Sequence, residues 1–372
     1  MVDRQEIAPS PGSVLEEMMK ERGWTQMDLA QILDKPQRSI SEIITGKKAV
    51  TPETACALAQ AFSNDPAFWI ELEGRYRLSL AGSAGTAVRE RAKLYELAPI
   101  KDMEKRGWIR KAASPDEIAA ELKKFFGVED LTVPLEIGAY AKKTQRETPL
   151  APEQRAWCFR ARNLAAPQKV DRFTESNFES GMKELRRLAA WPEETRRVPH
   201  VLASMGIRFV LNEPLPRTRI DGAAFWLDDE SPAIALSVRF DRIDSFWHTL
   251  GHELSHIKNR DGMMVDVDLV GENRPSPVEL SVIESRADAE AVDLVVDRRD
   301  LEDFIIRVGP LYSRARINQF ANKIKIHPGI IVGHLQYRGE LNYSQLRDIL
   351  VKVREFVAAE AITDGWGHQT TM

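Results

Sequence analysis

Two histidines and a glutamate between residues 252 and 256 have the spacing of a metal-binding helix. The stretch reads His252-Glu253-Leu254-Ser255-His256, and residues four apart share one face of a helix. The two histidines could bind one Zn²⁺ at about 2.0–2.1 Å each, with Glu253 placed to accept a proton from a water held by the metal. The alternative is an ordinary helix with two surface histidines. An apolar stripe predicts that this helix packs against a sheet: Phe246, Leu250, Leu254 and Ile257.

A catalytic zinc site also needs a third protein ligand and an open position. Downstream, "SPVELSVIESRADAEAVDLVV" predicts a helix over 277–296 that starts with Ser276 as its N-cap. Glu284 and Asp288 lie four residues apart on it. This ExxxD after an HExxH resembles the gluzincins, which implies that Glu284 ligates zinc and that Asp288 holds a ligand histidine through its other ring nitrogen. The alternative is a pair of solvated acids.

The segments around these helices predict how they are positioned. "GIRFVLNE", "GAAFWLDD" and "PAIALSVR" predict three strands of a small meander directly before the HExxH helix. We expect the strand over 232–238 to lie at the sheet edge, where an extended substrate could pair with it. His248 extends the row of histidines, but the row from His248 to His256 spans about 12 Å, too far for one ion, so His248 is a neighbour of the site. Tyr312 and His327 are candidates to stabilise an oxyanion.

Two stretches resemble the ImmA/IrrE family of zinc metallopeptidases. They read "RFDRIDSFWHTLGHELSHI" and "ESRADAEAVDLVV", and the resemblance covers residues 180–345. It implies a minimal gluzincin fold and peptide hydrolysis in which Glu253 activates a zinc-bound water. The sequence departs from the family pattern at Glu290 and Asp297, neither of which is a ligand. Zn²⁺ suits these ligands, and Mn²⁺ or Fe²⁺ remain alternatives.

The first eighty residues predict five helices and a helix-turn-helix. The spacing of the helix-turn-helix is met by a helix over 25–33, a turn at 34–36 and a helix over 37–45. The second of these helices would enter the DNA major groove. The expected base readers are Gln37, Arg38 and Ser39, with Glu42 one turn later. The expected phosphate contacts are Lys35, Lys47 and Lys48.

The charge balance of this segment leaves an alternative open. Residues 1–80 hold nine Lys and Arg against twelve Asp and Glu. Because phosphate contacts dominate affinity for DNA, a dimerisation or docking module is the other interpretation. Residues 12–78, however, resemble HigA/VapI-type antitoxins of the Xre helix-turn-helix class, most specifically in "ISEIITGKKAVTPETA" and "PAFWIELEGRY". That resemblance implies binding to operator DNA as a homodimer and a link to toxin–antitoxin regulation.

Composition sets the wider expectations. The chain has 372 residues, a length that indicates two or three domains. Its net charge of −4 argues neither for nor against nucleic acid. No apolar run is long enough to span a membrane, and the first residues lack the apolar core of a signal peptide. Cys56 and Cys158 form no disulfide framework, so a reducing cytoplasm is expected. We expect a helix-turn-helix domain over 1–80, a helical linker over 81–150, an α+β peptidase domain over 151–310 and a C-terminal helical extension over 311–372.

Two functions follow from these patterns. The first is a DNA-binding transcriptional regulator, antitoxin-like, whose zinc endopeptidase domain cleaves a regulatory protein partner such as a repressor or a toxin–antitoxin partner. The second is a non-enzymatic repressor or antitoxin whose zincin-like domain only binds a partner or senses a ligand. Intact His252, Glu253, His256 and Glu284 favour the first.

Overall fold

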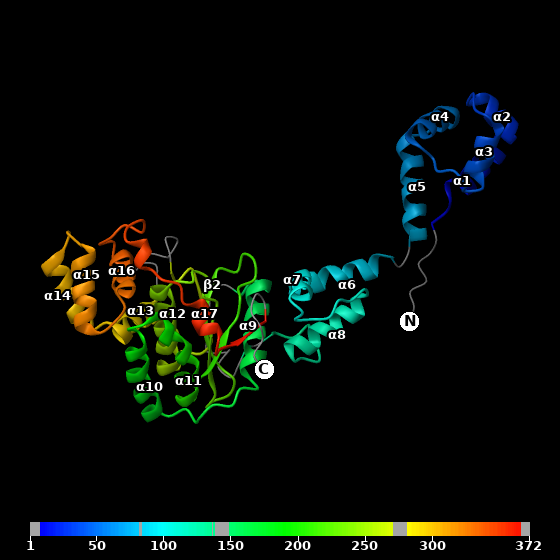
Figure 1. The fold of residues 1–372 in the computed structure, drawn as a ribbon. Coiled ribbons are helices and arrows are strands. Elements are labelled where there is room, and N and C mark those ends of the chain that lie inside the picture. The colour runs from blue at the N-terminus through cyan, green and yellow to red at the C-terminus, as the bar shows by residue number, and fades with distance from the viewer. Residues whose placement is uncertain (1–7, 82–83, 136, 138–148, 271–280, 366–372) are drawn as a thin grey trace. The chain divides into compact units, whose positions relative to one another are not determined.

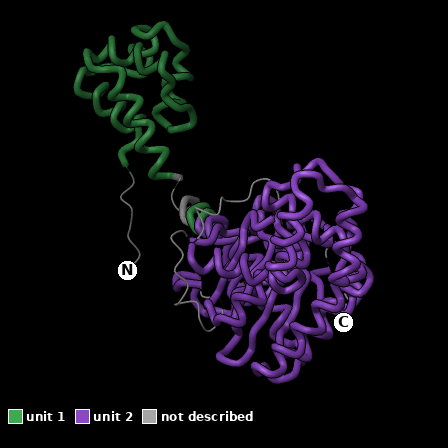
Figure 2. The backbone as a smooth tube through the Cα atoms, turned by 90° about the vertical axis from the view of Figure 1, so that its left-hand side faces the viewer, with its two compact units in different colours: residues 1–92 green, residues 93–372 purple. Residues whose placement is uncertain are grey.

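The computed structural model describes residues 8–81, 84–135, 137, 149–270 and 281–365. The chain forms two compact units, residues 1–92 and residues 93–372 (Figure 2). None of the helices in these described ranges is long and apolar enough to cross a membrane. Cys56 and Cys158 form no disulfide bond. The finer division into four domains stays a prediction.

Unit 1 contains the five predicted helices. They are α1 (Pro11–Glu21), α2 (Gln26–Ile32), α3 (Gln37–Ile44), α4 (Pro52–Phe62) and α5 (Pro66–Ala81), and α6 (Ala84–Leu97) follows them (Figure 1). Thr25 caps α2, because its backbone N–H donates to Asp28 Oδ2 at 2.7 Å while its side chain accepts from the Asp28 N–H. The unit has its own apolar core, which includes Leu15, Leu29, Ile40, Leu58 and Trp69.

Unit 2 surrounds a sheet with helices. Before the sheet come α7 (Ile100–Lys105), α8 (Pro115–Phe126), α9 (Pro152–Ala165), α10 (Glu175–Leu188), the 3₁₀ helix η2 (Pro192–Arg197) and α11 (Val198–Ser204). Within and after the sheet segments come α12 (Ile243–Asn259), α13 (Val282–Val295), α14 (Arg298–Val308), α15 (Arg314–Ile324), α16 (Pro328–Tyr337), the 3₁₀ helix η3 (Arg347–Ile349) and α17 (Arg354–Ala358). The structure therefore mixes helices with a small sheet, as the sequence predicts.

The sheet has five strands in the order β4-β2-β3-β1-β5. They are β1 (Arg208–Leu211), β2 (Ile220–Trp226), β3 (Pro232–Leu236), β4 (Met264–Val267) and β5 (Ile362–Thr363). The three predicted strands are confirmed, but the sheet is mixed and not a meander, because β1 runs parallel to both β3 and β5. The prediction that residues 232–238 form an edge strand is wrong. β3 is buried along its whole length, as a continuous apolar run in a sheet interior should be, and β4 takes the edge beside β2.

Helices cover both faces of this sheet. Alternate residues of a strand face opposite sides, and the apolar residues on each side pack into a core with helices. On one face, Ala224, Ile234 and Leu236 share a core with the apolar stripe of α12, which confirms the predicted packing of that helix. On the other face, Ala223, Phe225 and Ala235 share a core with α9 and with apolar residues of α7 and α8. The segment 100–126, expected in the helical linker, thus contributes to the core that supports the sheet.

Candidate functional sites

Helix α12 carries the HExxH motif on its buried side. The helix runs from Ile243 to Asn259, and His252, Glu253 and His256 are each 0% exposed. The alternative of two surface histidines is therefore excluded. Buried polar side chains need partners, so the neighbours of these three residues decide what the motif can do.

Helix α13 supplies the partners that the resemblance assigns. It begins at Val282 after Ser281, whose side chain accepts a hydrogen bond from the Glu284 N–H. The predicted start at residue 277 is wrong, and the expected N-cap Ser276 lies outside the described residues. Helices α12 and α13 approach closely, since a Cβ on Gly251 would lie 3.0 Å from the Cα of Ala291.

The close approach brings both predicted acids to the first histidine. Glu284 Oε2 lies 3.0 Å from His252 Nε2 and 3.9 Å from His256 Nε2. Asp288 Oδ1 lies 2.9 Å from His252 Nδ1. A carboxylate on Nδ1 fixes the imidazole tautomer and leaves Nε2 for a metal. The structure thus brings together His252, His256, Glu284 and Asp288, while their roles as ligands stay predictions.

Two further aspartates, not singled out by sequence analysis, complete the cluster. Asp261 Oδ2 lies 3.0 Å from His256 Nδ1 and is held by Arg286, so the second histidine has the same support as the first. An acid just beyond the end of α12 could have signalled this contact. Asp266 comes from β4, and its Oδ2 lies 3.6 Å from His252 Nε2 and 3.9 Å from His256 Nε2. No local spacing could have signalled Asp266, because strand pairing brings it here.

The cluster fits a divalent cation. His252 Nε2, His256 Nε2 and one carboxylate oxygen each of Asp266 and Glu284 lie within 4.8 Å of one another. Within the described part of the chain, His256 Nε2 and Asp266 Oδ2 are buried and lack a partner at hydrogen-bond distance. Such atoms cost about 1–3 kcal/mol each, and a cation would relieve that cost. Imidazole nitrogens and carboxylate oxygens are ligands that Zn²⁺ accepts.

The charges of the cluster also favour a bound cation. Burial lowers the pKa of His252, but Asp266, Asp288 and Glu284 outweigh burial and hold this pKa well above its usual value. Burial and the charge of Asp266 raise the pKa of Glu253 well above its usual value. The negative charge of Asp266 contributes to both pKa shifts, and buried negative charge of this kind favours a bound cation.

Gly222 leaves room for the carboxylate of Glu253, the proposed general base. A Cβ at this position of β2 would lie 2.1 Å from Glu253 Oε1 and 3.0 Å from Thr249 Cγ2. The Glu253 carboxylate therefore occupies space beneath the strand that any other residue at position 222 would fill. A glycine inside a strand marks a close approach of this kind, although the sequence does not tell which group approaches.

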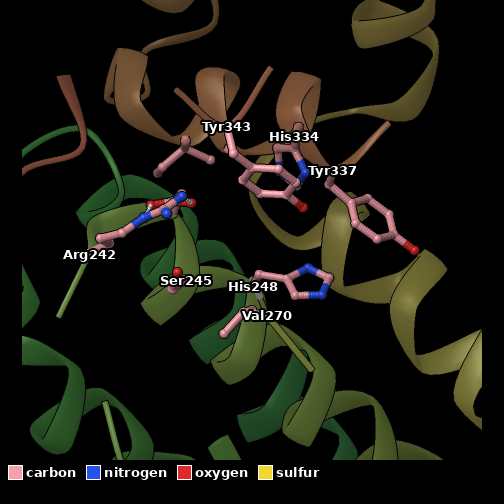
Figure 3. Close-up of a pocket in the computed structure, with 10 residues that line it drawn as sticks. Arg242, Ser245, His248, Val270, His334, Tyr337 and Tyr343 are labelled. Atoms are coloured by element: carbon pink, nitrogen blue, oxygen red, sulfur yellow. Dashed lines mark hydrogen bonds and ion pairs between the residues drawn. The ribbon is translucent and has the colours of Figure 1, made fainter. Parts of the chain in front are cut away.

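A cavity of about 40 Å³ lies next to His248, one helical turn before His252. His248 faces His334, Tyr337 and Tyr343 across it (Figure 3). The rings of His248 and Tyr337 are 5.9 Å apart, and His248 Nε2 lies 3.7 Å from Asp288 Oδ1. Burial lowers the pKa of His334 to about 4, so this histidine is neutral at pH 7.

The two predicted oxyanion candidates are engaged elsewhere. The Tyr312 hydroxyl donates to Glu340 Oε2 at 2.6 Å. His327 is the N-cap of α16, where its Nδ1 accepts from the Gly329 N–H at 3.1 Å. Neither belongs to the metal cluster or lines the cavity beside His248.

The helix-turn-helix segment presents its predicted contact residues on the surface. Asp34 in the turn has a φ of 48°, the left-handed conformation that aspartate tolerates. Ile40 and Ile43 hold α3 against the core, while Gln37 and Arg38 at its start are exposed. The remaining expected contacts are exposed at Lys47 and Lys48 and half-buried at Lys35, Ser39 and Glu42.

An ion pair engages Arg38, one of the expected base readers. Arg38 Nε lies 2.8 Å from Glu42 Oε1, and the Arg38 side chain is 87% exposed. Exposed pairs of this kind contribute about 0–1 kcal/mol. Arg38 can therefore exchange Glu42 for another acceptor at little cost.

The matches to known proteins described next lie in the N-terminal part of the chain. A family model described as helix-turn-helix matches residues 15–69. The chain is 35% identical over 80 residues to virulence-associated protein A' of Dichelobacter nodosus, covering 21% of this chain and 70% of that protein. It is 29% identical over 73 residues to the uncharacterized HTH-type transcriptional regulator YddM of Escherichia coli (strain K12), covering 20% and 78%.

One solved structure is also similar. An addiction module antidote protein of a HigA family from Coxiella burnetii is 30% identical, covers 20% of this chain and 84% of that chain, and gives a TM-score of 0.20. The resemblance to zinc metallopeptidases stays a prediction. Through residues 15–69, which hold most of α1, all of α2 to α4 and the start of α5, the chain belongs to the helix-turn-helix family.

Proposed function

We propose that this protein is a DNA-binding transcriptional regulator whose larger unit is a metal-dependent peptidase. The first half rests on the helix-turn-helix family and on its relative YddM, which is described as a transcriptional regulator. The second half rests on one observation. His252, His256 and Glu284 converge in a buried, negatively charged cluster beside Glu253.

His252, His256 and Glu284 would hold the cation through His252 Nε2, His256 Nε2 and Glu284 Oε2. Bound there, a divalent cation supplies Lewis acidity toward a scissile carbonyl. Asp288 and Asp261 keep the Nδ1 protons of the two histidines, so that both Nε2 atoms stay available. Glu253 takes a proton from the attacking water and passes it to the leaving amine.

The proposed substrate is a regulatory protein, such as a repressor or a toxin–antitoxin partner. A chain that joins a helix-turn-helix unit to a hydrolase suits a narrow regulatory cleavage better than general digestion. The small cavity beside His248, at about 40 Å³, would accept only a small part of such a substrate. Dimer formation on operator DNA belongs to this proposal as well.

The test is the substitution Glu253→Gln in the full chain. Candidate partner proteins are co-expressed with wild type, with Glu253→Gln and with the control Glu302→Gln, whose side chain is 48% exposed on α14. We expect partner fragments with wild type and the control, none with Glu253→Gln, and an equal content of one metal ion per chain in all three. Glu253 lies beside the proposed metal ligands but is not one of them. Replacing its carboxylate should therefore stop proton transfer and leave metal binding unchanged.

Identical fragments and partner levels for all three proteins would overturn the enzymatic proposal. The second candidate function, a non-enzymatic regulator that binds a partner or senses a ligand, would then remain. One observation favours that candidate: Asp266 already lies among the metal ligands.

A further inference from the structure

Strand pairing determines where the Asp266 side chain points. Asp266 of β4 pairs directly with Gly222 of β2, and directly opposed residues project to the same face of a sheet. That face is the α12 face, because a Cβ on Gly222 would contact Glu253 and Thr249. The edge strand therefore directs the Asp266 carboxylate at the two histidines of α12.

The Asp266 carboxylate oxygen lies where a fourth metal ligand would lie. Ligand atoms at about 2.0–2.2 Å from a tetrahedral Zn²⁺ are roughly 3.3–3.6 Å from one another. Asp266 Oδ2 is 3.6 Å from His252 Nε2 and 3.9 Å from His256 Nε2, and Glu284 Oε2 is 3.0 and 3.9 Å from the same atoms. Asp266 thus occupies the same kind of position as the expected third ligand.

The groups that act most strongly on the Asp266 carboxylate belong to the cluster itself, namely His252, His256 and Glu253. Asp266 is 6% exposed, and in the described part of the chain its Oδ2 has no partner at hydrogen-bond distance. His256 Nε2, on the other side of the gap between them, lacks a partner in the same way. A buried carboxylate oxygen without a hydrogen-bond partner is costly, and a cation between Asp266 Oδ2 and the two imidazole nitrogens would remove that cost.

We propose that Asp266 is a fourth protein ligand that closes the metal site and keeps the enzyme latent until its partner protein binds. This inference rests on the metal site of the proposed function and goes beyond it. Four protein ligands are typical of closed sites, whereas catalytic zinc keeps one position open for water or substrate. Asp266 must therefore withdraw before hydrolysis can begin.

The same strand blocks the substrate in a second way. β4 pairs with β2 along the sheet edge, and an extended peptide that added to the sheet beside the metal site would need that edge. Displacement of β4 would release the metal position and the sheet edge together. The activating event is therefore a movement of residues 264–267 away from β2.

The experiment uses the full chain loaded with Co²⁺, whose visible spectrum reports its coordination, and azide as the probe for an open position. Wild type is compared with Asp266→Ala, with Asp266→Asn, which keeps the side-chain volume, and with the control Asp293→Asn, whose side chain is 49% exposed on α13. We expect azide to leave the spectra of wild type and the control unchanged and to shift that of Asp266→Ala. Zn²⁺ affinity, from competition with a chelator, should fall at least about tenfold in Asp266→Ala, as loss of metal-site support does, and less in Asp266→Asn.

The two proposals fail in distinguishable ways. A wild-type spectrum that shifts with azide as readily as that of Asp266→Ala, together with equal Zn²⁺ affinities, would overturn the role of Asp266 and leave the metal site intact. A wild type that binds neither Zn²⁺ nor Co²⁺ stoichiometrically would overturn both. Thermal unfolding of each variant checks that it is folded. Where Asp266→Ala is not folded, the affinity and azide response of Asp266→Asn decide.

Discussion

At the scale of single residues, the site depends on what surrounds each chemical group more than on the motif itself. Glu253 has the reach of a general base, but its buried position depends on a glycine in a different element. A Cβ on Gly222 would meet Glu253 Oε1 at 2.1 Å. His252 and His256 each have a carboxylate on Nδ1, from Asp288 and Asp261, which makes the two imidazoles equivalent donors.

The substitution Gly222→Ala should reduce peptidase activity without removing the metal. The added methyl group would displace the Glu253 carboxylate, and a displacement of about 1 Å at a catalytic group costs roughly 10²-fold in rate. Glu253 is not among the expected metal ligands, so Zn²⁺ affinity should stay within a few-fold of wild type. Gly74→Ala serves as the control, since a Cβ there meets nothing within 4 Å. Unchanged turnover in Gly222→Ala would contradict this account of Glu253.

At the scale of elements, the proposed metal site belongs to a helix pair that packs on one face of the sheet. α12 supplies the histidines and α13 the acids, and the pair is close because Gly251 faces Ala291. Strand β4 then contributes Asp266 from the third side. In unit 1, the pair α2 and α3 is held by its apolar side, which leaves the start of α3 exposed.

Removing the carboxylate that α13 places on His252 should weaken metal binding. Asp288→Ala deletes the 2.9 Å contact to His252 Nδ1, and loss of such support costs 10–100-fold in metal affinity. Zn²⁺ competition with a chelator measures the change, and Asp293→Ala on the same helix is the exposed control. Equal affinities for Asp288→Ala and the control would show that Asp288 does not orient the histidine.

Substitutions in the helix-turn-helix should separate specificity from general affinity. Arg38→Ala removes an exposed side chain at the start of α3, and we expect it to relax operator preference at one base pair by about 1–3 kcal/mol. Lys47→Ala removes an exposed charge beyond α3 and should weaken binding to all sequences alike. Gel shifts with operator and random duplexes measure both effects. A wild type without sequence preference would contradict the regulator proposal.

At the scale of the whole molecule, the chain joins two units with separate cores. The core of residues 15–72 lies within unit 1, whereas two cores on either side of the sheet stabilise unit 2. Several ionisable groups are buried in unit 2, among them His334 of α16, which lines the cavity beside His248. The stability of unit 2 should therefore depend on pH.

Acidification should destabilise unit 2 partly through His334. Its pKa is about 4 in the folded state against 6.5 for the free side chain, so the unfolded chain binds the proton first as pH falls. Stability is retained above pH 6.5 and is lost between pH 6.5 and pH 4, by up to about 3 kcal/mol. Thermal unfolding of wild type and His334→Gln at pH 7 and pH 5 measures it. An equal loss in both proteins would contradict the assignment to His334.

The sequence by itself determined the features that depend on short-range spacing. The HExxH face, the cap at Thr25 and the three central strands all follow from periodicity and turn chemistry within a few residues. The helix-turn-helix was predictable for the same reason. The start of α13 at Val282 was not, because Ser276 and Ser281 are both acceptable N-caps in the sequence.

Only the tertiary structure decided the rest of the site. Asp266 joins the histidines because β4 pairs with β2 more than forty residues away, and β3 became an interior strand because β1 pairs on its other side. Gly222 matters because α12 presses a carboxylate against it. Such contacts arise from how faces pack, which local sequence does not specify. The sequence therefore predicts the proposed chemistry of the site, whereas the group proposed to control access to it is found only in the fold.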